Sequence, residues 1–527
     1  MEEKRVYEEN FLLKHKEDLF LYSLAFLKLV LPFFLQDSFY QPHRDELLYL
    51  AEGDHLSWGY LEIPPLLSVF AWITIHLGGA MFWIKIWPSL FSAWAFILCG
   101  KMVQKLGGNI FGIFLVWLPF MFGAYIRVFY LFQPNFLEEF FWIGLTYCLF
   151  NYIQTGENKW LYYLGISLGF GLLSKYSIAF YWVGLLLGLA LSNQRKIYRN
   201  PNFYYGMILA GLLFLPNMIW EYLHNFPFLH HMQQLKEEQL QYLQSSDFIK
   251  NQFLMNLAFV IIWLAGLLYL GMSKETKPFR LYFWAYFTVI ILLLVLKGKD
   301  YYALGAYPIL FVFGAYFLEK ATRGKKLYFR YILTIPMLAL GIFALPILIP
   351  VYGPEKLSQY FEKSGLAKTA FCTWEDQKSH PLPQDFADMM GWRELAVKSN
   401  KVYQDLPEGE KKNTIIFCDD YCYAGALTYF GKQMGMPEPY SDVSNFLLWI
   451  PEHIQFKNII VVRRKGLGQK DDDISGMFER ARVMDSLSIP LARENGTKIL
   501  LLEHTKPEFL KFIQDRITRK KSLFRRL

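Results

Sequence analysis

Two adjacent acidic residues, Asp45 and Glu46, follow the first long apolar stretch of the chain, with Arg44 directly before them. Charged groups next to hydrocarbon are costly unless they pair, face water or act on a ligand, so their presence here predicts a functional site. A carboxylate in this position could take the proton of a hydroxyl group that attacks the anomeric carbon of a sugar. Asp45 is therefore our candidate base, and a lipid-borne molecule is the expected substrate.

Adjacent acidic residues on a helix point roughly 100° apart, so Asp45 and Glu46 need not enter the same cavity, and one of them can be structural. A second carboxylate such as Glu46 or Glu138 could orient the acceptor or stabilise positive charge on an oxocarbenium-like sugar. Lysine and arginine side chains could hold an anionic phosphate without a metal ion. Any single basic residue could equally be a helix-end side chain that snorkels to water.

The elements that must position these residues are apolar helices. Hydrophobic residues make up 54% of the chain and aromatic residues 18%, and the apolar residues gather in blocks close to membrane-spanning length. The charged segment Met1–Asp18 lacks a small-residue cleavage site, which predicts a retained first helix. We expect a polytopic α-helical membrane protein with about eleven spans, near residues 18–36, 84–104, 110–127, 137–153, 159–173, 178–192, 203–220, 252–271, 280–296, 303–319 and 330–350.

Lysine and arginine in the short connections predict the orientation. With a cytoplasmic N-terminus, the connections that carry most of the basic residues fall inside, as the positive-inside bias requires. An odd number of spans then places the C-terminal domain outside the cytoplasm. The apolar segment Leu66–Gly79 is short and begins after a proline pair, so it is interpreted as an interfacial helix in the first outer loop. Counting it as a span would reverse the orientation of everything after it.

In this topology the unusual polar residues collect on the outer side. The residues predicted to bind substrate at this face are Arg44, Tyr49, Arg127, Lys175, Lys299, Tyr301 and Tyr302. Acids and bases meeting at one face indicate an interfacial enzyme.

The sequence predicts two domains, a membrane domain at residues 1–352 and an α/β domain at residues 353–527. In the second, strands are expected at 414–417, 458–462 and 498–502, with helices at 423–434 and 475–486. Asp419 and Asp420 follow the first of these strands, where α/β folds often bind ligands. Acidic residues at strand ends are also ordinary turn formers, so both interpretations stay open.

Several motifs resemble those of bacterial C-type (GT-C) glycosyltransferases of family 39, relatives of protein O-mannosyltransferases and of aminoarabinose transferases that act on lipid A. The first outer loop is similar in its acidic pair with Tyr49 and in the segments 58–60 and 64–65. Later similarities occur at residues 132–134 with Glu138 and Trp142, 171–176, 298–302 with 307–308, 388–392, and 423–427 with 430–431. The resemblance thus extends from the first outer loop into the C-terminal domain.

The resemblance implies a sugar donor carried on polyprenyl phosphate, transfer at the outer face of the bacterial inner membrane, and inversion at the anomeric carbon. The acceptor would be a lipid, a glycan or a protein. By position, Asp45 would be the base, Glu46 its acidic partner and Glu138 the acid of the second loop, while Lys175 and Lys299 would hold the lipid phosphate. Glu62 and Asn135 stand where the family pattern would have other residues, which affects the acceptor assignment more than the reaction class.

Other classes of protein are less compatible with the sequence. A transporter or flippase of a lipid-linked sugar would be expected to show repeated halves with broken helices near the bilayer midplane, and no such repeat is evident. A non-enzymatic assembly scaffold would not need Asp45 or Glu46. The net charge of +8 is explained by the inner connections and a basic C-terminal tail, so no nucleic-acid partner is expected. No cysteine spacing resembles a zinc site, so no metal ligand and no cofactor are expected. His230 and His231 could bind a metal or an acceptor, or be ordinary solvated side chains of a loop.

Overall fold

The structure is a computed structural model that describes residues 2–238, 240–242, 244–324, 327–464 and 476–525. It divides into two compact units, each assembled from separate stretches of the chain. The helical unit comprises Met1–Leu35, Lys85–Asn217 and Met232–Ile349, and the sheet unit comprises Gln36–Ile84, Met218–His231 and Pro350–Leu527. The sheet unit therefore contains more of the chain than the predicted domain of residues 353–527, because it also includes the first predicted outer loop.

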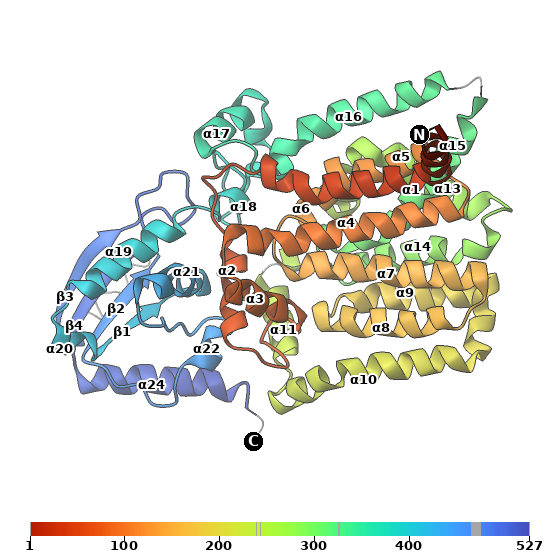
Figure 1. Cartoon of the computed structure of the whole chain (residues 1–527). Helices are drawn as coiled ribbons and strands as arrows, with labels where there is room; N and C mark the ends of the chain where they lie inside the picture. The colour runs from red at the N-terminus through yellow and green to blue at the C-terminus, as the bar shows by residue number, and fades with distance from the viewer. Residues whose placement is uncertain (1, 239, 243, 325–326, 465–475, 526–527) are drawn as a thin grey trace. The chain divides into compact units, whose positions relative to one another are not determined.

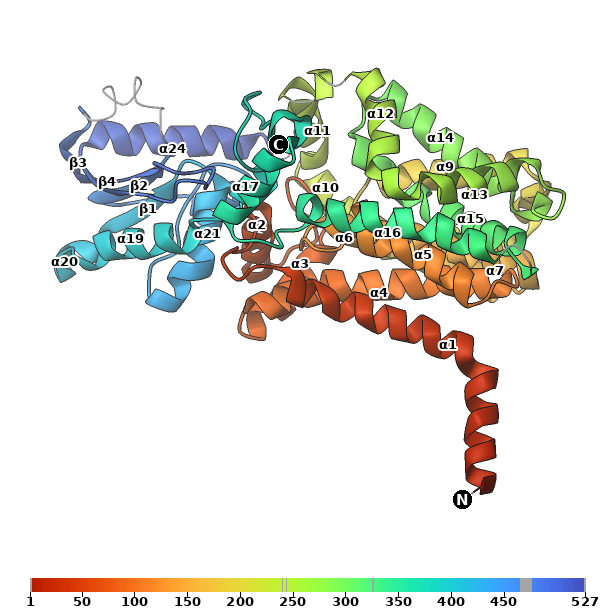
Figure 2. The ribbon, with the colours of Figure 1, turned by 90° about the horizontal axis from the view of Figure 1, so that it is seen from above.

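Most helices of the helical unit run along one common direction (Figures 1 and 2). The α-helices that lie wholly or mainly in it are α1 (Glu2–Leu35), α4 (Met81–Lys105), α5 (Ile110–Phe122), α6 (Ala124–Val128), α7 (Pro134–Thr155), α8 (Lys159–Ser174), α9 (Ile178–Leu191), α10 (Pro201–Leu223), α12 (Ser245–Met255), α13 (Val260–Met272), α14 (Leu281–Val295), α15 (Pro308–Ala321) and α16 (Tyr328–Leu348). Helix α11 (Pro227–Glu238) follows α10, and a 3-10 segment, η5 (Asp300–Ala306), precedes α15.

Each of the predicted spans coincides with one or more of these helices, so the helical membrane fold is confirmed. Among the described residues, five helices are long and apolar enough to cross a membrane by length and composition, or up to seven if each of two bent pairs is one span. Helices α5 and α9 are shorter apolar helices. The count of eleven crossings stays a prediction. The segment at Leu66 forms α3 (Leu66–His76), whose 11 residues are too few to span the roughly 20-residue hydrocarbon width.

Close helix packing in the helical unit depends on glycine. A Cβ atom at Gly266 of α13 would lie 1.9 Å from the carbonyl oxygen of Leu310 in α15, and one at Gly314 of α15 would lie 1.8 Å from that of Ile262. Small residues that let helix backbones approach in this way are typical of helix association in membranes. A buried carboxylate adds a polar anchor, since Glu319 of α15 accepts hydrogen bonds from the backbone N–H groups of Asn109 and Gly112 at the start of α5.

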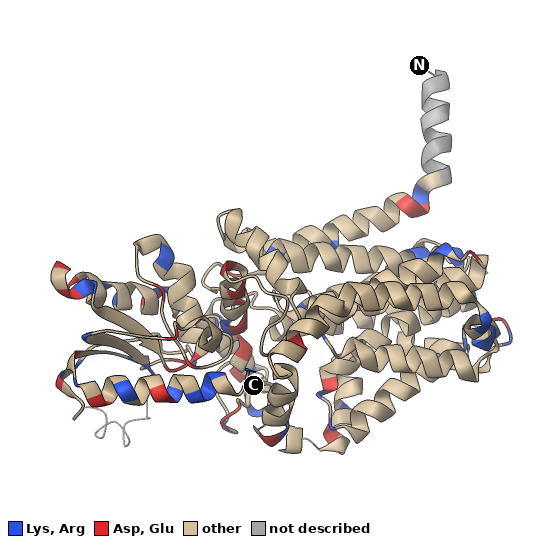
Figure 3. Cartoon of the chain, turned by 90° about the horizontal axis from the view of Figure 1, so that it is seen from below, with Lys and Arg blue, Asp and Glu red and all other residues tan. Residues whose placement is uncertain are grey.

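Lysine and arginine residues gather at one end of the helices of the helical unit, on the right of Figure 3. A concentration of lysine and arginine in the connections at one end is the pattern that the positive-inside bias produces. The side of the membrane on which this end lies stays a prediction.

The sheet unit contains a four-stranded sheet in the order β1-β2-β4-β3. Strands β1 (Thr414–Cys418) and β2 (Asn458–Arg463) are parallel, and β4 (Lys498–Thr505) is antiparallel to both β2 and β3 (Phe478–Ser486). The helices of this unit are α2 (Arg44–Asp54), α3, α17 (Pro354–Lys363), α18 (Gln384–Ala387), α19 (Trp392–Gln404), α20 (Glu408–Lys411), α21 (Tyr421–Gly431), α22 (Phe446–Trp449) and α24 (Pro507–Ser522).

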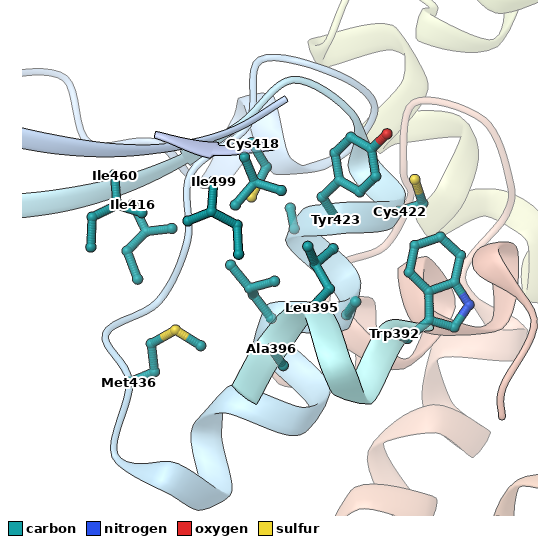
Figure 4. Packing of buried hydrophobic residues seen from close by; sticks show 14 of the residues in the cluster. Trp392, Leu395, Ala396, Ile416, Cys418, Cys422, Tyr423, Met436, Ile460 and Ile499 are labelled. Atoms are coloured by element: carbon teal, nitrogen blue, oxygen red, sulfur yellow. The ribbon is translucent and has the colours of Figure 1, made fainter. Parts of the chain in front are cut away.

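Alternation along β1, β2 and β4 builds one apolar core on each face of the sheet. Ile416, Ile460 and Ile499 point to the face covered by α19 and α21, where Trp392 and Tyr423 are also buried (Figure 4). The intervening residues point to the opposite face and pack with Phe509, Ile513 and Ile517 of α24. Successive side chains of a strand point to opposite faces, so a strand buried on both sides is apolar at every position.

The predicted strands at 414–417, 458–462 and 498–502 are confirmed as β1, β2 and β4, and the predicted helix at 423–434 is confirmed as α21 with a 3-10 turn after it. The predicted helix at 475–486 is wrong within the described residues, because Phe478–Ser486 is the strand β3. This strand lies at the sheet edge and is mostly exposed. An exposed edge strand lacks the apolar alternation from which strands are predicted, and charged residues are common at such edges.

Helix α2 packs closely on α21. A Cβ atom at Gly425 of α21 would lie 2.9 Å from the carbonyl carbon and 3.0 Å from the carbonyl oxygen of Leu47, so only glycine permits this approach. Leu47, Leu48 and Ala51 of α2 belong to the same apolar cluster as Trp392 and Ile416. The first predicted outer loop is therefore part of the core of the sheet unit.

Replacing Gly425 by alanine should destabilise the sheet unit by about 1–3 kcal/mol, because the added methyl group would force α2 and α21 apart. The measurement is the thermal unfolding midpoint of the purified protein in detergent. Gly409→Ala is the matched control, since a Cβ atom there meets nothing within 4 Å. Equal midpoints for Gly425→Ala and wild type would contradict the close contact.

Candidate active site

The N-terminus of α2 is fixed by a capping box. The ring of His43 accepts a hydrogen bond from the backbone N–H of Asp45 at 3.2 Å, and the Glu46 carboxylate accepts one from the backbone N–H of His43 at 2.7 Å. Glu46 is fully buried. Two otherwise unpaired backbone donors are satisfied reciprocally, which stabilises the first turn. The Glu46 carboxylate therefore faces the backbone at the start of α2.

Asp45 points to the start of α21. The hydroxyl group of Tyr421 donates a hydrogen bond to Asp45 Oδ1 at 2.7 Å, and the His43 Nδ1 atom lies 3.7 Å from Asp45 Oδ2. The side chain of Asp45 is 32% exposed. The hydrogen bond fixes the direction of the carboxylate, while the exposure leaves it accessible to a reacting molecule.

Arg44 contacts Asp420 and Tyr421 at the start of α21. Its guanidinium group is 3.2 Å from Asp420 Oδ1 and stands over the Tyr421 ring at 4.9 Å from the centroid. Asp420 also accepts a hydrogen bond from the backbone N–H of Cys422, which makes it the N-cap of α21. The Arg44 side chain is only 10% exposed, so this pairing compensates for the loss of its hydration. Of the acidic pair at the end of β1, Asp420 is therefore a helix cap and an ion-pair partner, while Asp419 pairs with Arg463 at 3.2 Å.

Glu62 adds a third carboxyl group near Asp45 and Asp420. It is half-buried in the connection between α2 and α3. Burial, together with the nearby carboxylates of Asp45 and Asp420, raises the pKa of Glu62 to about 7. A carboxyl group with such a pKa is partly protonated near neutral pH and can then donate a hydrogen bond.

Other residues of the first predicted outer loop hold it in place. Glu52 of α2 is fully buried and accepts hydrogen bonds from Ser68 Oγ at 2.7 Å and from the Asn445 side-chain amide at 2.8 Å. Asn445 in turn accepts a hydrogen bond from the backbone N–H of Leu61. Tyr49 packs against the apolar cluster of the sheet unit. These contacts position Asp45 and Glu62 rather than enlarge the site.

A second polar cluster lies in the helical unit, around Lys175 at the end of α8. The Lys175 ammonium group is 2.9 Å from Glu138 Oε2 and donates a hydrogen bond to Asn135 Oδ1 at 2.6 Å. The other oxygen of Glu138 accepts a hydrogen bond from the Ser177 hydroxyl group. Glu138 and Asn135 both lie in the first turns of α7, which begins with Pro134 at a position where its missing N–H costs nothing. The structure brings Lys175 and Glu138 together as a buried ion pair.

Two tyrosine rings complete this cluster. The Lys175 ammonium group stands 4.5 Å from the centroid of Tyr302 and 5.7 Å from that of Tyr301, both in η5. A cation over aromatic faces is stabilised by the ring quadrupole. Lys299 directly precedes η5 and is half-buried. Residue Asp300 beside it accepts a hydrogen bond from the Asn251 side chain at 2.7 Å, which ties η5 to α12.

Arg127 has a backbone partner. Its guanidinium group donates a hydrogen bond to the carbonyl oxygen of Leu348 at 3.5 Å, at the end of α16. A basic side chain at a helix C-terminus interacts favourably with the unpaired carbonyl groups there. This contact matches the helix-end interpretation of the residue.

The predicted residues thus fall into two groups, with Arg44, Asp45, Glu46 and Tyr49 in the sheet unit and the others in the helical unit. Sequence reasoning did not include Tyr421 or Glu62 in the site. The acidic pair at the end of β1 could have indicated Tyr421, because Tyr421 is the next residue. The position of Glu62 just before the proline pair could have indicated Glu62.

Comparisons with known proteins agree with this architecture. Residues 62–220 match the model of the family described as dolichyl-phosphate-mannose-protein mannosyltransferase. The structure of ArnT from Cupriavidus metallidurans bound to undecaprenyl phosphate matches with a TM-score of 0.61 at 9% identity, covering 92% of this chain and 98% of that chain. The same protein in the apo state gives 0.60 at 10% identity, with 92% and 97% covered. No curated protein matches the sequence.

The chain therefore has the fold of ArnT, including the part that carries the four-stranded sheet. The predicted resemblance to C-type glycosyltransferases related to the protein O-mannosyltransferases is confirmed by the family match and by this fold.

The raised pKa of Glu62 predicts a pH-dependent effect on stability. An unfolded glutamate titrates near pH 4.3, so between roughly pH 4.3 and 7 the unfolded chain releases a proton that the folded chain keeps. The stability of the folded state therefore falls as the pH rises through this window. Above pH 7 the whole destabilisation caused by the ionised Glu62 is present. Glu62→Gln should raise the unfolding midpoint at pH 8 by about 2–4 °C for each kcal/mol relieved, and change it little at pH 4.5.

The control for this measurement is Glu479→Gln, which neutralises an exposed carboxylate of β3. An equal effect of Glu62→Gln at both pH values would mean that Glu62 titrates as an ordinary glutamate.

Proposed function

We propose that this chain is a membrane glycosyltransferase that moves a sugar from a polyprenyl-phosphate donor to a lipid, glycan or protein acceptor. The observation that carries the proposal is the Asp45 carboxylate, held by the Tyr421 hydroxyl group and partly exposed, in a chain with the ArnT fold. The ArnT structure with bound undecaprenyl phosphate supports a polyprenyl phosphate as the carrier. The proposed place of reaction is the outer face of the bacterial inner membrane.

In the proposed reaction an acceptor hydroxyl oxygen forms a bond to the anomeric carbon while the bond from that carbon to the phosphate oxygen breaks. Asp45 takes the hydroxyl proton, and the released polyprenyl phosphate keeps the electron pair of the broken bond. A direct displacement of this kind inverts the anomeric carbon. The hydrogen bond from Tyr421 keeps the Asp45 carboxylate, which takes up the proton, in a fixed direction.

The other acidic residues have distinct proposed roles. Glu46 positions Asp45 through the capping box, since its carboxylate accepts from the His43 backbone. Glu62 in its protonated form can donate a hydrogen bond to the acceptor, because its pKa lies near neutral. Arg44 keeps Asp420 in place and offsets the negative charge of Asp420 and Asp388.

Lys175 and Lys299 are proposed to hold the donor phosphate. Lys175 is already paired with Glu138, so Glu138 is proposed to orient the lysine and to keep it charged within the protein. Tyr301 and Tyr302 limit the directions that the ammonium group can take. A charge-assisted contact to phosphate needs no metal ion.

Asp45→Asn should lower single-turnover sugar transfer by about 10²–10⁴-fold, because the amide keeps the shape of the side chain but cannot take up the proton. Binding of the polyprenyl-phosphate donor should be largely unchanged. Transfer is measured in nanodiscs, with donor binding measured separately. The matched control is Asp54→Asn at the other end of α2, where the carboxylate pairs with Lys432 on the surface. Transfer by Asp45→Asn at the wild-type rate would contradict the proposed mechanism.

Lys175→Ala should raise the donor concentration required for half-maximal transfer by about 10- to 150-fold, since a hydrogen bond to a charged group contributes about 1.5–3 kcal/mol. Lys159→Ala is the control, because Lys159 forms an exposed ion pair with Glu157. If Lys175 only balances the charge of Glu138, the double variant Lys175→Ala with Glu138→Gln should recover the wild-type donor requirement. That result would contradict the proposed role in phosphate binding.

A further inference from the structure

The sheet unit contains a polar cavity that the proposed reaction does not use. Its volume is about 520 Å³, within the roughly 300–1,000 Å³ range of ligand pockets. Trp374, His380, Arg464, Arg493, Glu494 and Asn495 line it among others. We propose that this cavity binds an uncharged saccharide that forms part of the acceptor. The assignment of the saccharide to the acceptor rests on the proposed function, whereas the binding of a saccharide does not.

The charges of the cavity are balanced by the protein itself. Arg493 pairs with Glu375 at 2.7 Å and with Asp388 at 3.1 Å, and Arg464 pairs with Glu494 at 2.8 Å. His380 lies 3.0 Å from Asp376. Because each of these basic groups faces a carboxylate, an anionic ligand would gain little net attraction and would repel the acidic partners. An uncharged ligand is the better match.

The polar groups suit a ligand with many hydroxyl groups. A carboxylate offers about four acceptor sites and a guanidinium group five N–H donors, so the ion pairs leave further sites for hydrogen bonds. Glu494 accepts from the Tyr423 hydroxyl group as well as from Arg464, which fixes its orientation. Asn495 adds an amide with both donor and acceptor ends. Hydroxyl groups both donate and accept hydrogen bonds, and the side chains that line this cavity can accept bonds from them and donate bonds to them.

One wall of the cavity is a fixed aromatic ring. The indole N–H of Trp374 donates a hydrogen bond to the carbonyl oxygen of Leu382 at 2.8 Å, and the ring stacks on His380 with centroids 3.5 Å apart. A ring held in this way loses little conformational freedom when a ligand binds. A saccharide combines an apolar C–H surface with a rim of hydroxyl groups, which corresponds to a tryptophan beside paired polar groups.

The cavity is connected to the Asp45 site through a shared residue. Asp388 pairs with Arg493 of the cavity, and its backbone carbonyl oxygen accepts a hydrogen bond from the backbone N–H of Arg44 at 3.1 Å. Asp388 is buried. A saccharide bound here would therefore lie next to the residues that fix the start of α2, which places an acceptor near the proposed base.

The test is saturation-transfer NMR of the full-length protein in nanodiscs, with glucose, mannose and N-acetylglucosamine as probes. At least one sugar should receive saturation from wild type, and Trp374→Ala and the milder Asn495→Ala should weaken its binding about tenfold, a difference of about 1.4 kcal/mol. Gln433→Ala, outside this cavity, is the control and should bind as wild type does. In transfer assays both cavity variants should raise the KM for a glycan acceptor while leaving the KM for the donor unchanged.

The absence of saturation transfer to all three sugars, or equal binding by the cavity variants and wild type, would overturn the inference. Binding of a Ser/Thr-rich peptide that competes with the sugars would overturn it in favour of a protein acceptor. Sugar binding that depends on Trp374 in a protein without transferase activity would support the cavity and refute only the proposed function.

Discussion

The arrangement of the candidate base depends on the contact between α2 and α21, which joins residues 376 positions apart in the sequence. Arg44 of α2 is nearly buried and would be strongly destabilising without Asp420, because an uncompensated buried charge costs about 3–5 kcal/mol. The same contact brings Tyr421 to Asp45. The backbone approach at Gly425 and the ion pair at Arg44 thus hold one helix in a single position.

The acidic residues around this contact show how one local environment can give similar side chains different properties. Glu46 is turned to the backbone and completes a capping box, whereas Asp45 keeps one side open to solvent. Glu62 retains its proton to a higher pH because it is buried near Asp45 and Asp420. Burial and neighbouring negative charge thus give Glu62 a higher pKa than an ordinary glutamate has.

The Lys175 cluster follows a related principle in the helical unit. A buried lysine is costly without a partner, and Glu138, Asn135 and two tyrosine rings surround it. Its carboxylate partner comes from α7, one turn after the helix begins at Pro134. Because the pair is already formed, the Lys175 ammonium group has a fixed direction, as the proposed role in holding the donor phosphate requires.

The sequence by itself determined the helical membrane fold, since blocks of apolar residues near spanning length have few other solutions. It also determined β1, β2 and β4, each of which contains a continuous run of apolar residues, and the choice of Asp45 and Glu46 as residues of interest. It failed at β3, because an exposed edge strand that pairs only with β4 carries no apolar pattern of its own.

Only the tertiary structure decided which acidic residue faces solvent, because adjacent helix positions are equivalent in sequence but not in their contacts. It also supplied Tyr421 and Glu62, whose place near Asp45 results from packing between distant segments. The cavity beside Trp374 has the same origin, since its lining residues come from three separate stretches between Trp374 and Thr497. Local patterns specify helices and strands, whereas a site built from side chains far apart in the chain exists only after those elements have packed.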